Sequence, residues 1–423
     1  MRSDVAPGDV RAQLPARPPE EPEPLSAVLS DLDRVIVPGL TQWQHPGFFG
    51  YFPAGTSGPS ALAELATAGL GVQGMLWSTS PAATELETHV LDWLAELLGL
   101  PARFRGRGVI QDTASSATLC ALLAARERAA AGGRELTVMA SSEAHSALDK
   151  AVAVAGLERE AIVRVPVDAR QRLDPAALAD LLAAQDGPVF LVATAGTTST
   201  GAFDPLDAIA AAVADRDVWL HVDGAWAGTA AVCPELRWVG EGLGAADSYV
   251  TNPHKWLLTA IDCSALWVAD PTWLERALTV TPEYLRNAAS DSGAVIDYRD
   301  WQIGLGRRFR ALKLWFVLRL IGAEGLRAHV RRHVALAQRL AARVDDHPRL
   351  HLAAPAELAL VCVTHAEGDA ATQRLLEAIN ADPQLLVTHT RVDGRLVLRV
   401  AIGGARTTER HVDHLWQVLA RAA

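Results

Sequence analysis

The stretch PVFLVATAGTTSTGAFDPLDAIAAAVADRDVWLHVD, residues 188–223, decides the fold. It begins and ends with apolar runs, at 188–196 and 218–223, in which polar and apolar residues do not alternate. Runs of this kind are typical of strands that are buried on both faces. Between them, Asp204-Pro205 opens a helix, because proline is tolerated in the first turn. The stretch therefore predicts two parallel strands joined by a helix.

The same alternation of strand-like and helical segments continues on both sides of this stretch. Strand-like segments read GVIQ (108–111), ELTVMAS (135–141), DSYVTN (247–252) and SALWVA (264–269). Helical segments fall at 115–130, from near Ala144, and from Asp174-Pro175 to about Ala184. We therefore expect an α/β protein with a mainly parallel sheet that helices cover on both faces. Such sheets bind ligands at the carboxyl ends of their strands.

The N-terminal quarter of the chain has other patterns. Residues 1–24 are rich in Pro, Glu and Arg, which predicts an extended arm. The segment 43–59 is aromatic and rich in glycine, so that we expect it to pack against another surface. A helix at 85–98 has one apolar face, and Thr84 with Glu87 predicts a capping box at its start.

After residue 298 the pattern changes to that of a small α+β domain. Long helical spacing is followed by a strand, a helix, a hairpin with its turn at Asp393-Gly394, and a final helix from Thr407. The predicted division is an N-terminal segment at 1–57, a large domain at 58–312 and a small C-terminal domain at 313–423.

Composition excludes several classes of function. The 423 residues carry a formal net charge of −10 without a long basic run, so that nucleic acid is not an expected partner. The N-terminus lacks the apolar run of a secretory signal, and the uncharged stretch 66–84 is too interrupted to span a membrane. The chain has four widely separated cysteines and no CxxC pair, so we expect reduced thiols in a cytoplasmic protein.

Two histidine pairs have a spacing that could suit a metal ion. His329 and His333 are four residues apart on an expected helix, and His411 and His414 are three apart on another. No carboxylate or thiol signature accompanies either pair. We therefore expect both pairs on helix surfaces, and no metal site.

A single lysine stands in the apolar stretch TNPHKWLLTAIDCSALWV, residues 251–268. Lysine is rarely buried without a partner. Lys255 could pack its stem and extend its ammonium group to water. Alternatively, it could be a desolvated amine that forms a Schiff base with a carbonyl compound.

Three other features follow strands, and each has an ordinary and a chemical interpretation. Asp223 ends the strand VWLHVD, where it could cap a turn or hold a proton on a pyridine nitrogen. TASSAT (113–118) could supply N-caps or seat a phosphate at a helix N-terminus. His145 in SSEAHS could be structural or could stack on a ring. Together with Lys255, they match the needs of pyridoxal phosphate (PLP), whose aldehyde binds lysine and whose ring accepts electrons.

The chain resembles the PLP-dependent aromatic-L-amino-acid decarboxylases, the group II decarboxylases, from about residue 24 to its end. The resemblance is carried by HPGFFGYFP, SPAATELE, SSEAHS, VATAGTTSTGAFD, HVDGAWAG, ADSYVTNPHKWLL, DCSALWV and WQIGLGRRFRALK. It implies the PLP-dependent transferase fold (fold type I), with PLP bound in the large domain. It also implies a homodimer with a shared active site, in which 43–52 meets the partner.

The resemblance implies roles for the matching residues. Lys255 would bind the cofactor aldehyde, Asp223 would pair with the pyridine nitrogen and His145 would stack on the ring. The other residues expected in the cofactor pocket are Ala114, Ser115, Thr198 and Asn252. The residues expected near the substrate are Phe52, Ala54, His254 and Gly306.

Three of the matched positions bear on the shape of the pocket. Ala54 stands where the family has threonine, and Trp226 stands where it has tyrosine. Gly306 in LGRRFR matches relatives that leave room for a large ring, a pattern seen with indolic substrates. We therefore predict tryptophan or 5-hydroxytryptophan as substrate, with dopa, tyrosine and phenylalanine as competitors.

The predicted reaction is decarboxylation to an amine. Tyr284 lies in the polar segment 280–298, which resembles a mobile lid, and would return a proton to the substrate carbon. An alternative is an aldehyde synthase, a relative that consumes oxygen and typically replaces the lid tyrosine or the stacking histidine. Tyr284 and His145 both match the decarboxylases instead. A further alternative is a non-catalytic scaffold that binds PLP only to fold.

Overall fold

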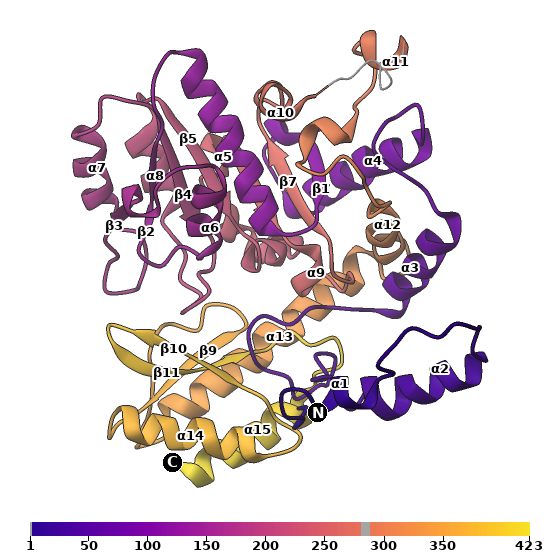
Figure 1. The fold of residues 1–423 in the computed structure, drawn as a ribbon. Helices are drawn as coiled ribbons and strands as arrows, with labels where there is room; N and C mark the ends of the chain where they lie inside the picture. Colours follow the sequence, from indigo (N-terminus) through magenta and orange to yellow (C-terminus); the bar gives the residue numbers. More distant parts are fainter. Residues whose placement is uncertain (1, 281–287) are drawn as a thin grey trace.

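The computed structural model describes residues 2–280 and 288–423. A seven-stranded sheet lies in the upper part of the molecule as drawn in Figure 1. The strand order is β1-β7-β6-β5-β4-β2-β3. The strands are β1 (Gly108–Gln111), β2 (Thr137–Ser141), β3 (Val163–Val165), β4 (Val189–Thr194), β5 (Val218–Asp223), β6 (Ser248–Thr251) and β7 (Ser264–Val268). Neighbouring strands are parallel except at β7, which is antiparallel to both β1 and β6. The expected mainly parallel sheet is confirmed.

Helices pack on both faces of this sheet. The helices of this part of the chain, which cover the sheet or lie beside it, are α3 (Gly58–Leu70), α4 (Pro81–Leu98), α5 (Ala114–Ala131), α6 (Ala147–Val154), α7 (Pro175–Ala183), α8 (Leu206–Val213), α9 (Pro253–Trp256), α10 (Thr272–Leu278), α11 (Ala288–Asp291) and α12 (Ala311–Leu320). In β4, Phe190 and Val192 join the core formed with α5, α6 and α10. Leu191 and Ala193 join the core formed with α4, α7 and α8. Successive side chains point to opposite faces, so a strand covered twice is apolar at every position.

A smaller antiparallel sheet follows, with strand order β10-β11-β9-β8. Its elements are α13 (Gly322–Asp345), β8 (Leu350–Leu352), β9 (Leu360–His365), α14 (Asp369–Ala381), β10 (Thr388–Val392), β11 (Arg395–Ala401) and α15 (Glu409–Ala422). Asp393 and Gly394 join β10 to β11 with φ angles of 49° and 78°. Two successive positive φ angles are those of a type I′ turn, so the predicted hairpin is confirmed.

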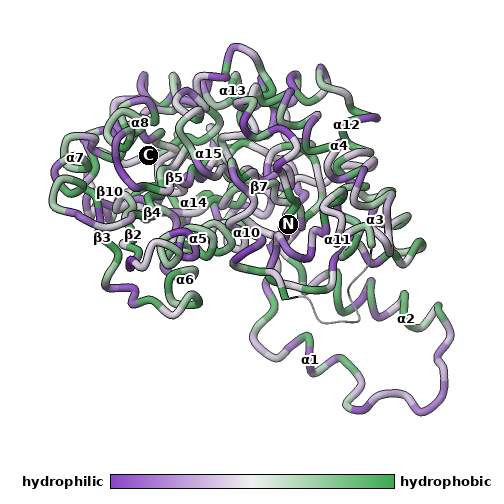
Figure 2. Tube along the Cα trace, turned by 90° about the horizontal axis from the view of Figure 1, so that it is seen from above, coloured by the Kyte–Doolittle hydropathy of each residue, from purple (hydrophilic) through white to green (hydrophobic). Residues whose placement is uncertain are grey.

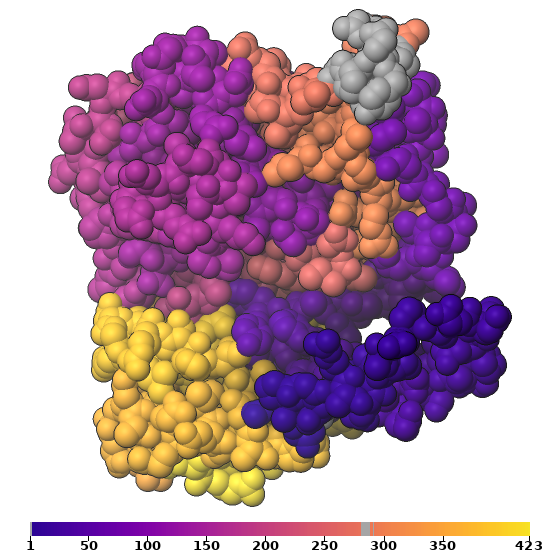
Figure 3. Space-filling view, in the orientation of Figure 1, coloured from indigo at the N-terminus to yellow at the C-terminus, as the bar shows by residue number. Residues whose placement is uncertain are grey.

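The N-terminal arm extends from the body of the molecule, as Figure 2 and Figure 3 show. It contains α1 (Asp9–Gln13) and α2 (Leu25–Asp31), which continues as a π-helical turn at Leu32–Ile36. The expected arm at 1–24 is therefore present, and it contains one short helix, α1, that its composition did not predict. There the Asp9 carboxylate accepts a hydrogen bond from the Ala6 amide at 2.8 Å and closes a turn that starts the helix.

The aromatic segment after the arm packs in part against the small sheet region. Phe48 and Phe49 are buried, and the Phe49 amide donates to the Leu386 carbonyl at 2.8 Å. Gly47 allows this approach, because a Cβ atom there would lie 1.9 Å from the Gln384 carbonyl oxygen. Tyr51 remains 56% exposed.

Two expectations about helices are wrong. The helix α4 begins at Pro81, so Thr84 and Glu87 lie inside it and form no capping box. Glu87 is instead buried, accepts from the Ile110 amide at 2.7 Å and pairs with Arg307. His329 and His333 lie on α13, but they are 3% and 0% exposed rather than on a helix surface. The helix is covered on more than one side, by the small sheet and by the turn at 227–232.

Two features absent from the described residues bear on function. In 2–280 and 288–423, no helix has both the length and the apolar content needed to cross a bilayer. The same residues contain no group of three or more His, Cys, Asp or Glu side chains arranged for a metal ion.

Candidate active site

Lys255 lies in α9, a single helical turn that is separated from the end of β6 by one residue, Asn252. Its side chain lines a cavity of about 230 Å³. Nζ lies 5.5 Å above the ring centroid of Phe52. Within the described residues, no carboxylate lies close enough to Lys255 to form an ion pair. Burial lowers the pKa of the Lys255 amine; Asp223 opposes this shift and Arg399 adds to it. An amine in such surroundings loses its proton more readily than an exposed lysine, which makes it a better nucleophile.

Asp223 reaches the same cavity from the end of β5. Its backbone is fixed from both sides, because β5 pairs with β4 and with β6 at this residue. Asp223 Oδ1 accepts from the Ala225 amide at 2.9 Å. Its second oxygen has no hydrogen-bond partner among the described residues, and is therefore available to a group in the cavity.

The N-terminus of α5 supplies donors for an anion. Thr113 caps this helix by accepting from the Ser116 amide at 3.4 Å. The amides of Ala114 and Ser115 precede that bond and, in the described structure, have no acceptor. Both residues line the cavity. Free first-turn amides and the helix dipole suit a phosphate group.

Asn252 and Thr194 add polar groups to the cavity wall. The Ser264 hydroxyl donates to Asn252 Oδ1 at 2.6 Å, so the Asn252 amide nitrogen is left for the cavity. The hydroxyl of Thr194 is buried and lacks a partner among the described residues. Thr194 was missed in the sequence, where it reads as one more residue of a buried strand.

His145 lies on the exposed rim of the cavity, after β2. Its Nδ1 accepts from the Ala147 amide at 3.0 Å, so the neutral ring carries its proton on Nε2. Partial burial lowers the pKa of His145; the carboxylate of Asp223 opposes this shift and Lys255 adds to it.

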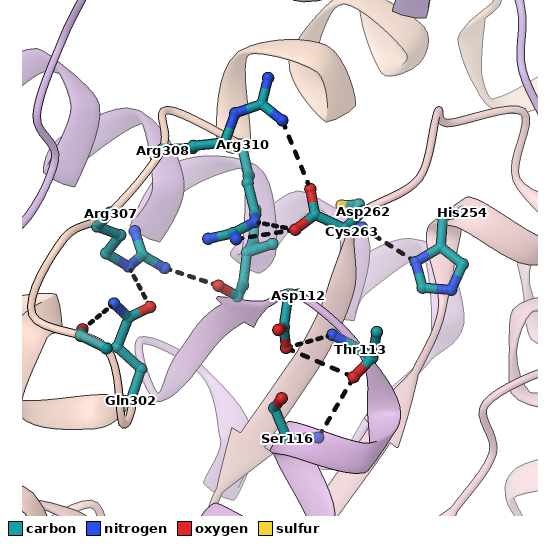
Figure 4. Close-up of polar contacts among 12 residues, drawn as sticks. Asp112, Thr113, Ser116, His254, Asp262, Cys263, Gln302, Arg307, Arg308 and Arg310 are labelled. Carbon is teal, nitrogen blue, oxygen red and sulfur yellow. Dashed lines mark hydrogen bonds and ion pairs between the residues drawn. The ribbon is translucent and has the colours of Figure 1, made fainter. Parts of the chain in front are cut away.

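His254, next to the lysine, is oriented by its backbone neighbours. Its Nδ1 accepts from the Cys263 amide at 3.0 Å (Figure 4). Asp262, which precedes Cys263, forms an ion pair with Arg310 at 2.8 Å, and this pair holds the backbone next to His254 in place. Burial lowers the pKa of His254 to about 4, with Lys255 contributing. His254 is therefore neutral near pH 7 and presents an Nε2–H donor.

The structure brings together most of the residues predicted for the site. The predicted residues that line the cavity are Phe52, Ala114, Ser115, His145, Thr198, Asp223, Asn252, His254 and Lys255. Ala54 and Gly306 do not line it. Gly306 borders a second cavity of about 350 Å³ with Gln302 and Arg310. Figure 4 shows Gln302 and Arg310 beside the start of α5. Tyr284 lies outside the described residues.

Sequence reasoning also missed Arg399 of β11. Its side chain is 4% exposed and lies 5.2 Å from the Phe52 ring centroid, on the ring that also meets Lys255. Nε donates to the Ser199 carbonyl at 3.2 Å, whereas one terminal nitrogen has no partner in the described structure. The signal in the sequence would have been an arginine inside an otherwise apolar strand, because β11 reads RLVLRVA and is buried at every position after Arg395.

These groups fit pyridoxal phosphate. A partly desolvated amine, a carboxylate with a free oxygen, two free helix amides and an unpartnered buried hydroxyl surround one cavity. They lie at strand ends of an α/β sheet, where ligands bind in such folds. Fold and site together define a PLP-dependent enzyme of fold type I.

Comparison with known proteins narrows this class. The model of the pyridoxal-dependent decarboxylase conserved domain matches residues 7–365. The chain is 43% identical to the phenylacetaldehyde synthase of Arabidopsis thaliana, covering 100% of this chain and 90% of the relative. It is 41% identical to tryptophan decarboxylase 2 of Oryza sativa subsp. japonica, covering 99% and 88%. The crystal structure of Oryza sativa TDC with PLP and tryptamine superposes with a TM-score of 0.96 at 38% identity, covering 99% and 92%. The chain belongs to the pyridoxal-dependent decarboxylase family.

Proposed function

We propose that this chain decarboxylates an aromatic L-amino acid to the corresponding amine, with tryptophan or 5-hydroxytryptophan preferred. The observation that carries the proposal is the juxtaposition of Lys255 and Asp223 in one cavity whose wall includes Phe52 and Trp226. This aromatic wall suits a large ring, and the same cavity is lined by polar side chains. The relatives include a tryptophan decarboxylase, which supports the same substrate class.

Each residue of the cavity has one task in this proposal. Pyridoxal phosphate, when bound, supplies an aldehyde that joins amines and a ring that accepts the electrons left when carbon dioxide departs. Lys255 would hold that aldehyde through its amine. Asp223 would keep the ring nitrogen protonated. The amides of Ala114 and Ser115 would bind the phosphate, helped by the Asn252 amide.

The remaining tasks concern protons and orientation. His145 would cover one face of the ring from the rim of the cavity, and its Nε2–H donor points away from the Ala147 amide. His254 stays neutral and donates a hydrogen bond without supplying charge. Tyr284, proposed from the family resemblance, returns a proton to the substrate carbon.

We also propose a homodimer in which a second copy completes the site. Leu25, Val28 and Leu65 are 71%, 53% and 72% exposed, which leaves large apolar areas without cover in one copy. Ile303 is 57% exposed in the same short loop as Gly306. Gly306 borders a different cavity from Lys255 in its own chain, so it would meet substrate only in the partner.

Two coarser expectations complete the proposal. We keep the division into 1–57, 58–312 and 313–423, in which the large part binds the cofactor. We also keep a cytoplasmic location, for which the four free cysteines are the support.

Product analysis tests the function. The purified chain with added PLP is given tryptophan, 5-hydroxytryptophan, dopa, tyrosine and phenylalanine separately, and amine and carbon dioxide are measured. Equal amounts of both products, with the highest kcat/KM for an indolic acid, are expected. A clear preference for tyrosine over tryptophan would refute the substrate proposal.

One relative favours a second candidate activity. Because a phenylacetaldehyde synthase is 43% identical to this chain, the same reactions are also assayed for aldehyde, ammonia and hydrogen peroxide. Aldehyde with stoichiometric peroxide would identify an oxidative enzyme. A cofactor that binds without turnover of any of the five acids would support a scaffold.

Gly306→Ser tests the substrate pocket. A Cβ atom at position 306 would meet only Gln73 Nε2, at 3.4 Å, so the variant should fold. We expect kcat/KM for tryptophan to fall about tenfold relative to tyrosine, since added bulk penalises the larger ring. Gly304→Ser, in the same loop, is the matched control. An unchanged ratio in Gly306→Ser would remove this residue from the substrate site.

A further inference from the structure

Three aromatic side chains, Phe52, Trp226 and Trp256, stack beside the cavity, and His333 meets the edge of Trp256; we term these four residues the aromatic column. Phe52 and Trp226 stack at 4.3 Å between ring centroids with an interplanar angle of 13°. Trp226 and Trp256 stack at 5.1 Å and 17°. Trp256 and His333 are nearly parallel, at 6.4 Å and 4°.

The column joins the two groups on which the chemistry depends. Trp226 follows Asp223 by three residues, and Trp256 follows Lys255 directly. Their stacking therefore connects the end of β5 to the single turn of α9. Phe52, at the far end, lies under the lysine amine. A shift of Trp256 along the column would move Lys255 relative to Asp223.

The column has one polar anchor. The indole N–H of Trp256 donates to His333 Nδ1 at 3.0 Å, and both side chains are essentially buried. His333 belongs to α13, which rises from the small sheet toward α9 (Figure 1). The bond thus ties the lysine turn to a helix 77 residues further along the chain.

To accept the hydrogen bond from Trp256, the imidazole of His333 must be neutral, and its surroundings favour the neutral form. Burial lowers the pKa of His333 well below its ordinary value, and His329 and Arg332 add to this effect. Nδ1 therefore remains an acceptor across the working pH range. Loss of the acceptor would leave a buried indole N–H without a partner, which costs about 1–3 kcal/mol.

We propose that His333 is a positioning residue, which holds Lys255 relative to Asp223 by anchoring the aromatic column through Trp256. This inference rests on the proposed role of Lys255 as the reactive amine. His333 touches neither substrate nor cofactor and acts through Trp256 alone.

The test compares three variants. His333→Leu removes the acceptor, His333→Gln can restore one through its side-chain carbonyl, and His329→Leu removes a neighbouring histidine that is equally buried. His329 accepts a bond from Arg332 at 3.1 Å and makes none to Trp256. For each apoprotein, PLP affinity is measured by titration. The pH midpoint of Lys255 labelling is measured by adding PLP and trapping with borohydride.

We expect His333→Leu to bind PLP about tenfold more weakly. Its labelling midpoint should move to higher pH, because a displaced amine meets more water while Asp223 still favours its charged form and Arg399 opposes it. His333→Gln should recover most of both changes, and His329→Leu should match the parent chain. If His333 had a purely structural role, His333→Leu would lower the melting temperature, but the pH midpoint of Lys255 labelling, measured on the folded protein, would not move.

The outcomes separate this inference from the proposed function. If the parent chain is not labelled at Lys255, the proposed role of that lysine fails and the inference fails with it. If the parent is labelled but His333→Leu equals His329→Leu in affinity and midpoint, only the inference is overturned. Should His333→Leu not fold, Trp256→Phe removes the donor, keeps a ring in the column and carries the same expectation.

Discussion

Two of the three lysines of this chain are enclosed by protein, and they are held in opposite ways. Lys313 of α12 is 1% exposed, with Nζ 2.5 Å from Glu64 Oε1 and 3.6 Å from Asp262 Oδ1. Lys255 has no carboxylate at ion-pair distance among the described residues and meets an aromatic ring and a cavity instead. Both amines are removed from water, but only Lys313 has carboxylates beside it that compensate its charge.

The difference separates a structural lysine from a reactive one. A buried charge with well-placed partners keeps its proton, and removal of a partner is costly. A buried amine without them gives up its proton more easily and becomes a nucleophile. Burial of a lysine therefore says little about function until its partners are known.

Lys255→Ala should have the largest effect on activity, and it tests whether Lys255 is the reactive lysine of the pair. Without the amine, PLP is held only by its phosphate and ring contacts, and decarboxylation should fall at least about a thousandfold. Amine release at saturating PLP measures this. Lys313→Met, assayed at a temperature where it is folded, is the control and should keep kcat within about twofold. Substantial turnover by Lys255→Ala would contradict its role.

Lys313→Met should instead lower stability. Glu64 and Asp262 would lose a shared cation, although Arg308 and Arg310 still pair with them. We expect the free energy of unfolding to fall by about 2–3 kcal/mol. Denaturant unfolding of the apoprotein measures the change, with Lys150→Met at an exposed position as the control. Equal stability of the two variants would mean that the buried network contributes nothing.

Asp223→Asn should leave attachment at Lys255 possible and impair catalysis. The amide does not hold a proton at the ring nitrogen as the carboxylate does, so kcat should fall about a hundredfold. The change also removes the charge that raises the pKa of Lys255, so the labelling midpoint of the apoprotein should move to lower pH. A midpoint that rises would contradict the electrostatic account.

Arg399→Met should shift the labelling midpoint of Lys255 the least, and in the direction opposite to Asp223→Asn. Arg399 lowers the pKa of Lys255, so its removal should raise the labelling midpoint of the apoprotein toward that of an ordinary lysine. Thr388→Val is the matched control, because it deletes the 3.3 Å bond from Arg399 and keeps the charge. If both variants shift the midpoint equally, geometry rather than charge is responsible.

The sequence predicted those parts of the fold that local pattern determines. The unbroken apolar runs at 188–196 and 218–223 marked strands buried twice, and Asp393-Gly394 marked the hairpin. The lysine cavity was also predictable, because the carboxyl ends of parallel strands meet at one edge of a sheet. Asp223 ends a strand, Lys255 and His145 each follow one, and the three residues therefore converge.

The remainder depended on tertiary packing. His329 and His333 read as a surface pair, since nothing in the helix reveals that both the small sheet and the turn at 227–232 cover it. Glu87 read as a cap, because its partner Arg307 lies 220 residues away. Arg399 read as an ordinary strand residue, and the assignment of Gly306 to a separate cavity depends on the path of its loop.

The most direct measurement uses the fact that the chain contains three lysines. The purified protein is loaded with PLP, reduced with borohydride and mapped by peptide mass spectrometry. The account predicts a pyridoxyl group on Lys255 and none on Lys150 or Lys313. A modified Lys313, or an unmodified Lys255 in a preparation with bound cofactor, would contradict it.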